Sequence, residues 1–149
     1  LATKQAGKPI FGVCFGHQIM ADTFGGKAQK AEDGNVVGVR DFTTAAGDPF
    51  SAYVWHQDQV TVLPPGATVV AKAPYCPMAA LRYDFPAFSV QYHPEFNHRF
   101  LTDLLKRGRD HFVDAKIADT AWDEISAKPV DVHLNSHQVA AFFRDHQDR

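Results

Sequence analysis

A cysteine between two glycines is the residue of this sequence best placed for covalent chemistry. Cys14 stands in the segment Gly-Val-Cys-Phe-Gly at positions 12–16, between an apolar run and a stretch with helical spacing of apolar residues. A strand, a tight turn and a helix in this order form a nucleophile elbow, in which small residues such as Gly12 and Gly16 permit the turn. The helix N-terminus favours the thiolate. We predict that Cys14 is a nucleophile and that the backbone N–H of Phe15 faces an oxyanion; the alternative is a buried, unreactive cysteine.

A thiol nucleophile needs a base that is close in space rather than in sequence. The segment His93-Pro94-Glu95 follows the apolar run at positions 88–92. On an extended chain, residues i and i+2 point to the same side, and Pro94 disfavours helical geometry at His93. We therefore predict that Glu95 binds one ring nitrogen of His93 and leaves the other for Cys14. A histidine with a purely structural role is the alternative.

A metal site is the competing interpretation of the same histidine. His93, Glu95 and His98 are close in sequence, and the segment His-Gln-Asp at 56–58 adds further ligand types. However, the helical zinc motif is His-Glu-x-x-His, whereas here Pro94 separates the first histidine from the glutamate. We predict neither a metal ion nor an organic cofactor.

The composition is that of an ordinary globular domain. The chain has 149 residues, of which 45% are hydrophobic and 21% are charged. A formal net charge of −2 and a pI near 6.5 give no basis for binding nucleic acid or an anionic membrane. No apolar run approaches the roughly 20 residues of a membrane span. Two cysteines, Cys14 and Cys76, are too few for a disulfide framework, so we expect a reducing, cytoplasmic compartment.

Apolar periodicity predicts a strand–helix unit, then a β-rich middle, then helices. The predicted strands cover residues 10–13, 35–44, 51–55, 68–73, 78–83 and 87–92. The predicted helices start at residue 16 and end at Gly25-Gly26, then cover 99–106, where Gly108 is the stop, and 112–127, and the last is capped by Asn135 or Ser136. This order indicates an α/β fold with a partly parallel central sheet.

Three segments together resemble the class I, triad-type glutamine amidotransferases. They are residues 12–18, residues 56–60 followed by Leu63-Pro64, and residues 91–96; the middle one is particularly similar to relatives of the amidotransferase domain of GMP synthase. The likeness runs from about residue 7 to residue 96. It implies a three-layer, flavodoxin-like α/β fold with a mixed central sheet. It also implies hydrolysis of the glutamine side-chain amide to glutamate and ammonia, with a synthetase or other ammonia acceptor as the partner.

The resemblance also implies a role for individual residues. Cys14 would attack the side-chain amide of glutamine and form a γ-glutamyl thioester. His93 would activate the thiol and then protonate the departing ammonia, while Glu95 orients His93. The substrate-binding residues that it implies are Phe15 through its backbone N–H, Gln18, His56 and Asp58.

The family domain has a section before the nucleophile strand that holds the first strands of the sheet and a glycine-rich loop with half of the oxyanion hole. We expect residues 1–149 to be a single amidotransferase domain that lacks this N-terminal section, with 97–149 as its variable helical C-terminal part. Two other functions stay open. One is a γ-glutamyl peptide hydrolase, which breaks the same kind of bond with the same triad. The other is a non-catalytic binding or regulatory module.

Overall fold

The computed structural model describes residues 1–146, in which it places eight strands and five helices. The strands are β1 (Ile10–Val13), β2 (Lys27–Lys30), β3 (Val36–Thr44), β4 (Pro49–His56), β5 (Asp58–Val62), β6 (Ala67–Ala73), β7 (Cys76–Tyr83) and β8 (Ala87–Val90). The helices are α1 (Ala2–Gln5), α2 (Phe15–Thr23), α3 (His98–Gly108), α4 (Ala115–Ala127) and α5 (Val132–Arg144).

Six of the strands form one mixed sheet in the order β1-β8-β7-β6-β3-β4. Only β1 and β8 pair in parallel, with Val13 opposite Val90, and the other pairs are antiparallel. Because parallel strands end at the same edge of a sheet, the segments that follow β1 and β8 meet there. These are the segments that carry Cys14 and His93.

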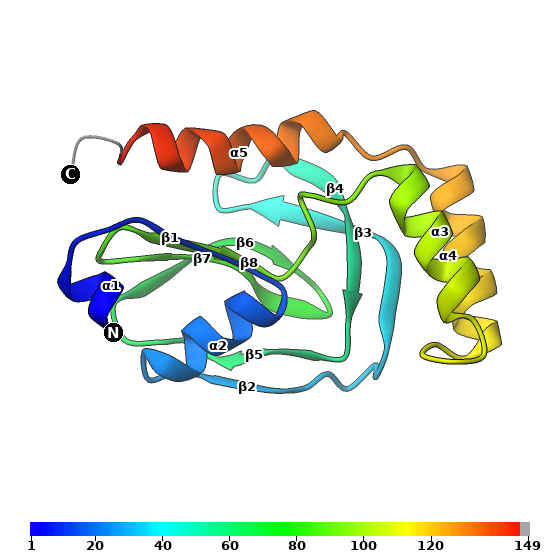
Figure 1. Ribbon diagram of the computed structural model, residues 1–149, viewed down its shortest axis with the longest axis horizontal. Coiled ribbons are helices and arrows are strands. Elements are labelled where there is room, and N and C mark those ends of the chain that lie inside the picture. Colours follow the sequence, from blue (N-terminus) through cyan, green and yellow to red (C-terminus); the bar gives the residue numbers. More distant parts are fainter. Residues whose placement is uncertain (147–149) are drawn as a thin grey trace.

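The chain forms three layers (Figure 1). Helix α2 and the two-stranded ladder of β2 and β5 cover one face of the sheet, and α5 lies along the opposite side. Helices α3 and α4 stand together beside β3 and β4, at the right of the view. The predicted three-layer α/β fold with a mixed central sheet is therefore confirmed.

The apolar core is divided into separate clusters of buried side chains. One core lies mainly within the sheet, between strands β3, β4 and β6–β8, and Phe142 of α5 packs against it. A second joins α2 and β5 to the sheet through Met20, Ala21 and Val60. The third holds α3 and α4 against β3 and β4 through residues such as Leu101 and Leu105. A cavity of about 370 Å³ opens between α5 and strands β6–β8, and its lining includes neither Cys14 nor His93.

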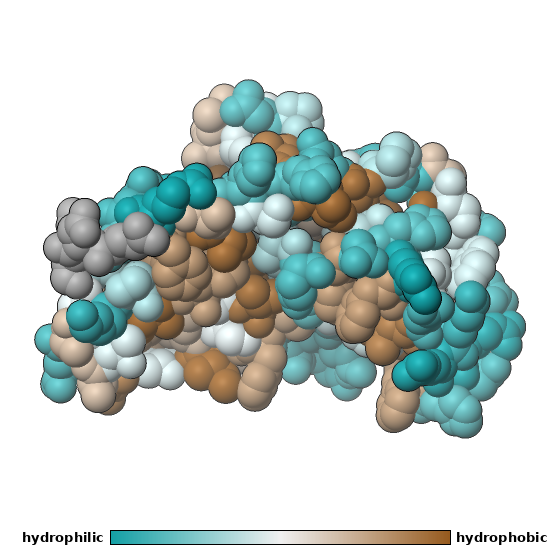
Figure 2. Space-filling view, turned by 45° about the horizontal axis from the view of Figure 1, so that its top comes forward, coloured by the Kyte–Doolittle hydropathy of each residue, from teal (hydrophilic) through white to brown (hydrophobic). Residues whose placement is uncertain are grey.

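The surface differs from one side of the molecule to the other (Figure 2). Polar and charged residues cover the right edge, where α3 and α4 stand, and apolar side chains are exposed across the left and middle of the face shown. Among the residues that the structure describes, no helix is long and apolar enough to cross a membrane.

Two strands were missed by the sequence prediction. β2 and β5 pair with each other across the α2 face, and both are short and largely polar, so neither shows the alternation of a strand with one buried face. β2 pairs with a segment that lies far along the chain, and local patterns carry no information about such pairing.

The helix ends in the C-terminal part also correct the prediction. α4 begins at Ala115 rather than at residue 112, because the Asp114 side chain accepts a hydrogen bond from the backbone N–H of Lys116. α5 begins at Val132, and its cap is Asp131, whose side chain accepts from two backbone N–H groups, rather than Asn135 or Ser136.

Gly108 was predicted to stop α3, but it is the last residue inside that helix. A side chain at this position would approach the Trp55 ring to 3.1 Å. The packing of the Trp55 indole against the helix therefore explains why position 108 has no side chain.

Candidate active site

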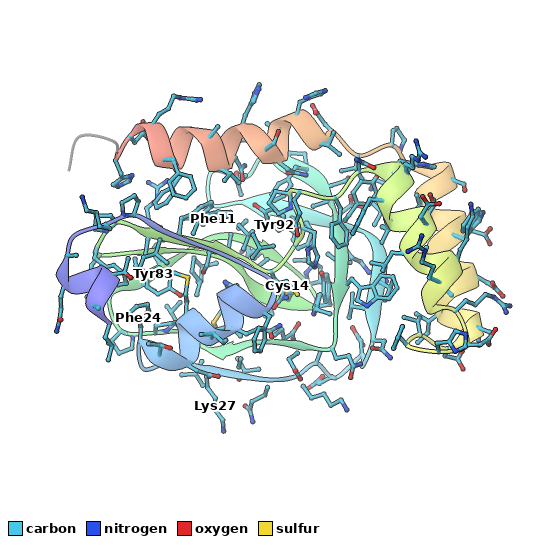
Figure 3. The ribbon with its side chains drawn as sticks, in the orientation of Figure 1. Phe11, Cys14, Phe24, Lys27, Tyr83 and Tyr92 are labelled. Atoms are coloured by element: carbon cyan, nitrogen blue, oxygen red, sulfur yellow. The ribbon has the colours of Figure 1, made fainter. Side chains whose placement is uncertain are left out.

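Cys14 occupies a strained position between β1 and α2. It is the N-cap of α2 with φ 51° and ψ −104°, and a positive φ is costly for any residue other than glycine. Its backbone N–H donates to the carbonyl of Val90 at 2.8 Å, which holds the turn against the end of β8. Figure 3 shows Cys14 at the N-terminal end of α2. This is the backbone of a nucleophile elbow, as the sequence predicts.

The two glycines of the motif have different roles. A Cβ on Gly12 would lie 2.9 Å from the carbonyl carbon and oxygen of Gly16, so the strand and the helix can approach only because residue 12 has no side chain. A Cβ on Gly16 would meet no atom within 4 Å. The prediction that both positions must be small is therefore wrong for Gly16.

The Cys14 thiol is half-buried and lies where three segments meet. Its Sγ is 3.5 Å from the carbonyl oxygen of Trp55 at the end of β4. The first N–H groups of α2, beginning with Phe15, have no acceptor inside their own helix, which is the usual state of a helix N-terminus. The Phe15 side chain is 69% exposed, so only its backbone belongs to this junction.

His93 is fixed by three contacts. Its backbone N–H donates to the carbonyl of Tyr53 at 2.9 Å, and its ring stacks on Phe96 with centroids 4.0 Å apart. Its Nδ1 donates to Oε1 of Glu95 at 2.6 Å. This leaves Nε2 as the nitrogen free to face the thiol.

The path of the chain between His93 and Glu95 differs from the prediction. The segment is a turn, not an extended strand, and the backbone N–H of Phe96 closes it on the carbonyl of His93 at 3.3 Å. Pro94 occupies the second position of this turn, where proline is favoured. The turn brings the two side chains together as the extended chain was expected to do.

The surroundings of His93 favour the protonated form of its ring. Burial acts to lower the pKa of His93, but hydrogen bonds and charge interactions with Cys14 and Glu95 outweigh burial and raise the pKa to about 9. A ring that holds its proton at neutral pH can stabilise a thiolate beside it and can later donate that proton.

The predicted substrate-binding residues Gln18, His56 and Asp58 converge on one backbone carbonyl. Gln18 Nε2 donates to the carbonyl oxygen of Asp58 at 2.7 Å and to Oε1 of Gln91 at 3.2 Å. His56 Nδ1 donates to the same Asp58 carbonyl at 2.9 Å. Burial chiefly lowers the pKa of His56 to about 4, so its ring is neutral. The Gln18 and His56 side chains are both buried, so they support the β4–β5 turn from the interior of the protein.

Several residues of this site carry no signal in the sequence. Trp55 and Tyr53 belong to the site through their backbone carbonyls, which accept from the Cys14 thiol and from the His93 backbone N–H. Any residue type could provide such a carbonyl. Gln91 could have been suspected, since a glutamine in an apolar strand run is unusual, and it is fully buried. Within residues 1–146, no group of three or more His, Cys, Asp or Glu side chains could hold a metal ion.

The arrangement can perform nucleophilic acyl transfer. A thiol at a helix N-terminus adjoins a protonated imidazole, and a carboxylate fixes the tautomer of that imidazole. Free backbone N–H groups at the start of α2 can stabilise negative charge on a carbonyl oxygen that the sulfur attacks.

Comparison with known proteins shows the family of the chain. Residues 2–108 match the family described as Glutamine amidotransferase class-I. A glutamine-hydrolysing GMP synthase subunit of Thermococcus kodakarensis is 37% identical over 98 residues, which cover 60% of this chain and 52% of that protein. Glutamine-hydrolysing GMP synthase of Lactobacillus gasseri is 36% identical over 136 residues, covering 84% of this chain and 26% of that protein. The chain thus spans about half the length of the GMP synthase subunits that it matches.

Solved structures share the fold. A glutamine amidotransferase from Thermotoga maritima superposes with a TM-score of 0.68 at 21% identity, over 85% of this chain and 60% of that one. A glutamine amidotransferase from Methylobacillus flagellatus gives a TM-score of 0.75 at 16% identity, over 97% of this chain and 66% of that one.

Proposed function

The chain belongs to the class I glutamine amidotransferase family, and from this membership we propose that it hydrolyses the side-chain amide of glutamine to glutamate and ammonia. The observation that carries the proposal is the elbow cysteine together with His93, whose Nδ1 lies 2.6 Å from Glu95 and whose pKa is raised to about 9 by Cys14 and Glu95. An unreactive structural cysteine would need neither the strained backbone nor the charged neighbour.

The proposed reaction runs through a thioester. The Cys14 sulfur attacks the side-chain carbonyl carbon of glutamine, and the backbone N–H of Phe15 stabilises the oxyanion that develops. His93 gives its Nε2 proton to the departing ammonia, which leaves a γ-glutamyl thioester on Cys14. The neutral His93 then takes a proton from water, whose oxygen attacks the thioester and releases glutamate. Glu95 holds the ring and its tautomer through both steps.

We propose that the turn from His56 to Asp58 lines the α-amino and α-carboxyl end of the substrate, mainly through its backbone. Gln18 and His56 then act on the substrate through this turn, because both side chains bind the Asp58 carbonyl. Their buried positions support an indirect role of this kind.

An ammonia acceptor is part of the proposal. Relatives named as one subunit of a GMP synthase support a partner that is a synthetase, and the cytoplasm is the compartment we propose. Residues 1–149 would supply the nucleophile, base and orienting carboxylate of a single amidotransferase domain, with 97–149 as its variable helical part.

Glutamate release from glutamine tests this function, measured on this chain and on the longest natural protein that contains it. Cys14→Ala is expected to lower the rate by about 10³-fold or more. Cys76→Ala is the matched control, because Cys76 is the other free cysteine, is fully buried and lies outside the site. A γ-glutamyl dipeptide is assayed beside glutamine. Cleavage of the dipeptide alone would replace the proposal with a γ-glutamyl peptide hydrolase, and no release of glutamate from either substrate above the level of Cys14→Ala would point to a non-catalytic module.

A further inference from the structure

A second histidine lies in the interior directly behind the nucleophile. His17 belongs to the first turns of α2 and is 0% exposed. Its Nε2 is 3.0 Å from the carbonyl oxygen of Met78, and its Nδ1 is 2.7 Å from the hydroxyl of Ser89. Because a carbonyl only accepts, Nε2 carries the hydrogen and Nδ1 accepts from the Ser89 hydroxyl. Both ring nitrogens are therefore used.

These two bonds join three elements. His17 lies on α2, one turn after Cys14, while Met78 lies on β7 and Ser89 on β8. His93 follows the end of β8. The contact between His17 and Ser89 therefore links the helix that presents the nucleophile to the strand that leads to the base. It lies in the interior, where an unmade hydrogen bond is costly and a made one is directional.

We propose that His17 is a positioning residue of the active site, and that its hydrogen bonds to Ser89 and Met78 set the distance and angle between Cys14 and His93. The proposal rests on the function proposed above for Cys14 and His93, but it concerns their geometry and not their substrate. Apolar packing alone would hold α2 on the sheet without fixing its rotation, since burial has no preferred direction. Two hydrogen bonds from one rigid ring fix both the rotation of the helix and its height above the strands.

The neutral state of the ring supports this assignment. Burial chiefly lowers the pKa of His17 to about 4. At neutral pH the ring therefore keeps one donor, which the Met78 carbonyl accepts, and one acceptor, to which the Ser89 hydroxyl can donate. A protonated ring would have two donors and would compete with the Ser89 hydroxyl hydrogen.

The test measures the reactivity of the Cys14 thiol, which needs neither glutamine nor a partner. In a Cys76→Ala background, the rate of Cys14 alkylation by iodoacetamide is recorded from pH 5 to pH 10. His17→Leu removes both hydrogen bonds and is expected to slow alkylation at pH 7 by about tenfold and to shift the pH midpoint upward. His17→Gln can still donate to Met78 and is expected to recover part of the rate. Ser89→Ala removes one bond and is expected to slow the reaction about fivefold.

Controls separate positioning from general damage to the fold. Tyr83→Phe removes a hydroxyl that lies 3.5 Å from Ser89 and has no bond to α2, while the ring keeps its packing against the helix, so the pH profile should match that of the parent. The effect of Ser89→Ala should nearly vanish in the His17→Leu background if the two residues act through one bond. If His17→Leu fails to fold, Ser89→Ala and His17→Gln carry the test.

Two outcomes would overturn the proposal. One is a folded His17→Leu or Ser89→Ala protein with the rate and pH midpoint of the parent. The other is an equal shift in Tyr83→Phe, which would indicate a loosened core instead of a specific bond. Failure of the proposed function can be distinguished from failure of this proposal. If the parent protein does not hydrolyse glutamine, but alkylation of its Cys14 still slows when His17 is substituted, the proposed substrate is wrong and the positioning role of His17 stands.

Discussion

The nucleophile region, built from β1, α2 and β8, and the helical region from α3 to α5 are held in place by different forces. In the nucleophile region, buried polar groups bond to backbone carbonyls, as His17 does to Met78 and Gln18 to Asp58. In the helical region, α3 and α4 attach through an apolar cluster. Ion pairs such as Arg99 with Asp103 are exposed, at 92% and 52%, although Arg40 and Glu124 are partly buried, at 29% and 34%.

This difference indicates in which parts of the molecule the side chains must be positioned accurately. Hydrogen bonds depend on distance and angle, whereas apolar burial depends mainly on area. A site that transfers a proton between sulfur and nitrogen requires the first kind of support. Helices that only cover a sheet require the second, and they tolerate small shifts.

Loss of the carboxylate of Glu95 is expected to have the largest effect. Glu95→Gln removes the negative charge that helps to raise the pKa of His93, and it weakens the control of the imidazole tautomer. Glutamate release should fall by about 10³-fold, measured as kcat/KM. Glu124→Gln is the matched change in the helical region, where it removes the ion pair with Arg40, and it should leave the rate within about twofold. Equal losses in the two variants would contradict the division between the regions.

Acid should weaken the fold through two buried histidines, His17 in the nucleophile region and His56 at the end of β4. The pKa values of His17 and His56 are lowered to about 4, whereas these side chains titrate near 6.5 in the unfolded chain. Between these values only the unfolded chain takes up the protons, so the contribution of these two histidines to stability is full above about pH 6.5 and falls as the pH drops towards 4. The loss should reach about 3 kcal/mol per histidine.

Urea unfolding at several pH values between 7.5 and 4 measures this loss. His17→Gln removes one of the two groups, so the dependence of unfolding free energy on pH should weaken by up to one proton. An unchanged slope would show that His17 is not held neutral in the fold.

The positions of the candidate catalytic residues could be predicted because each follows an apolar strand. An elbow cysteine and a His-Pro-Glu segment at strand ends meet when the two strands are parallel neighbours, as β1 and β8 are. The polar supports could not be predicted in the same way. His17 resembles any histidine packed in a helix, and only the long-range packing of α2 against the hairpin of β7 and β8 places Met78 and Ser89 around it.

The missed strands and the wrong cap of α5 have one physical origin. β2 and β5 are stabilised by pairing with each other and not by an apolar pattern within either strand. The cap of α5 is Asp131 because Asn135 is buried against β4, where its side chain donates to the carbonyl of Ser51. In each case a distant contact decides between local alternatives. Local sequence specifies which elements exist, and tertiary contacts select where they begin and what they pair with.

Steric crowding at the elbow gives a smaller effect. Gly12→Ala places a methyl group 2.9 Å from backbone atoms of Gly16, so strand and helix must separate at a cost of about 2 kcal/mol. Gly16→Ala is the control, since a methyl group there meets open space in a helix that alanine favours, and stability should stay equal or rise by up to about 1 kcal/mol. Chemical denaturation measures both, and alkylation of Cys14 should slow only in Gly12→Ala. Similar stabilities for the two variants would mean that α2 tilts freely and that its position is not tightly set.

The smallest effect is expected from the best-formed ion pair of the helical region. Arg109 donates to both carboxylate oxygens of Asp119 at 2.9 Å and joins the turn after α3 to α4. Both side chains are largely in solvent, so water and salt screen the attraction, and the apolar cluster beneath already holds the two helices together. Asp119→Asn should therefore leave the thermal midpoint unchanged at low and at high salt. A clear drop of the thermal midpoint at low salt that disappears at high salt would show that charge as well as apolar burial holds α4 in place. The two regions would then differ in how exposed their polar contacts are, and not in the kind of force that holds them.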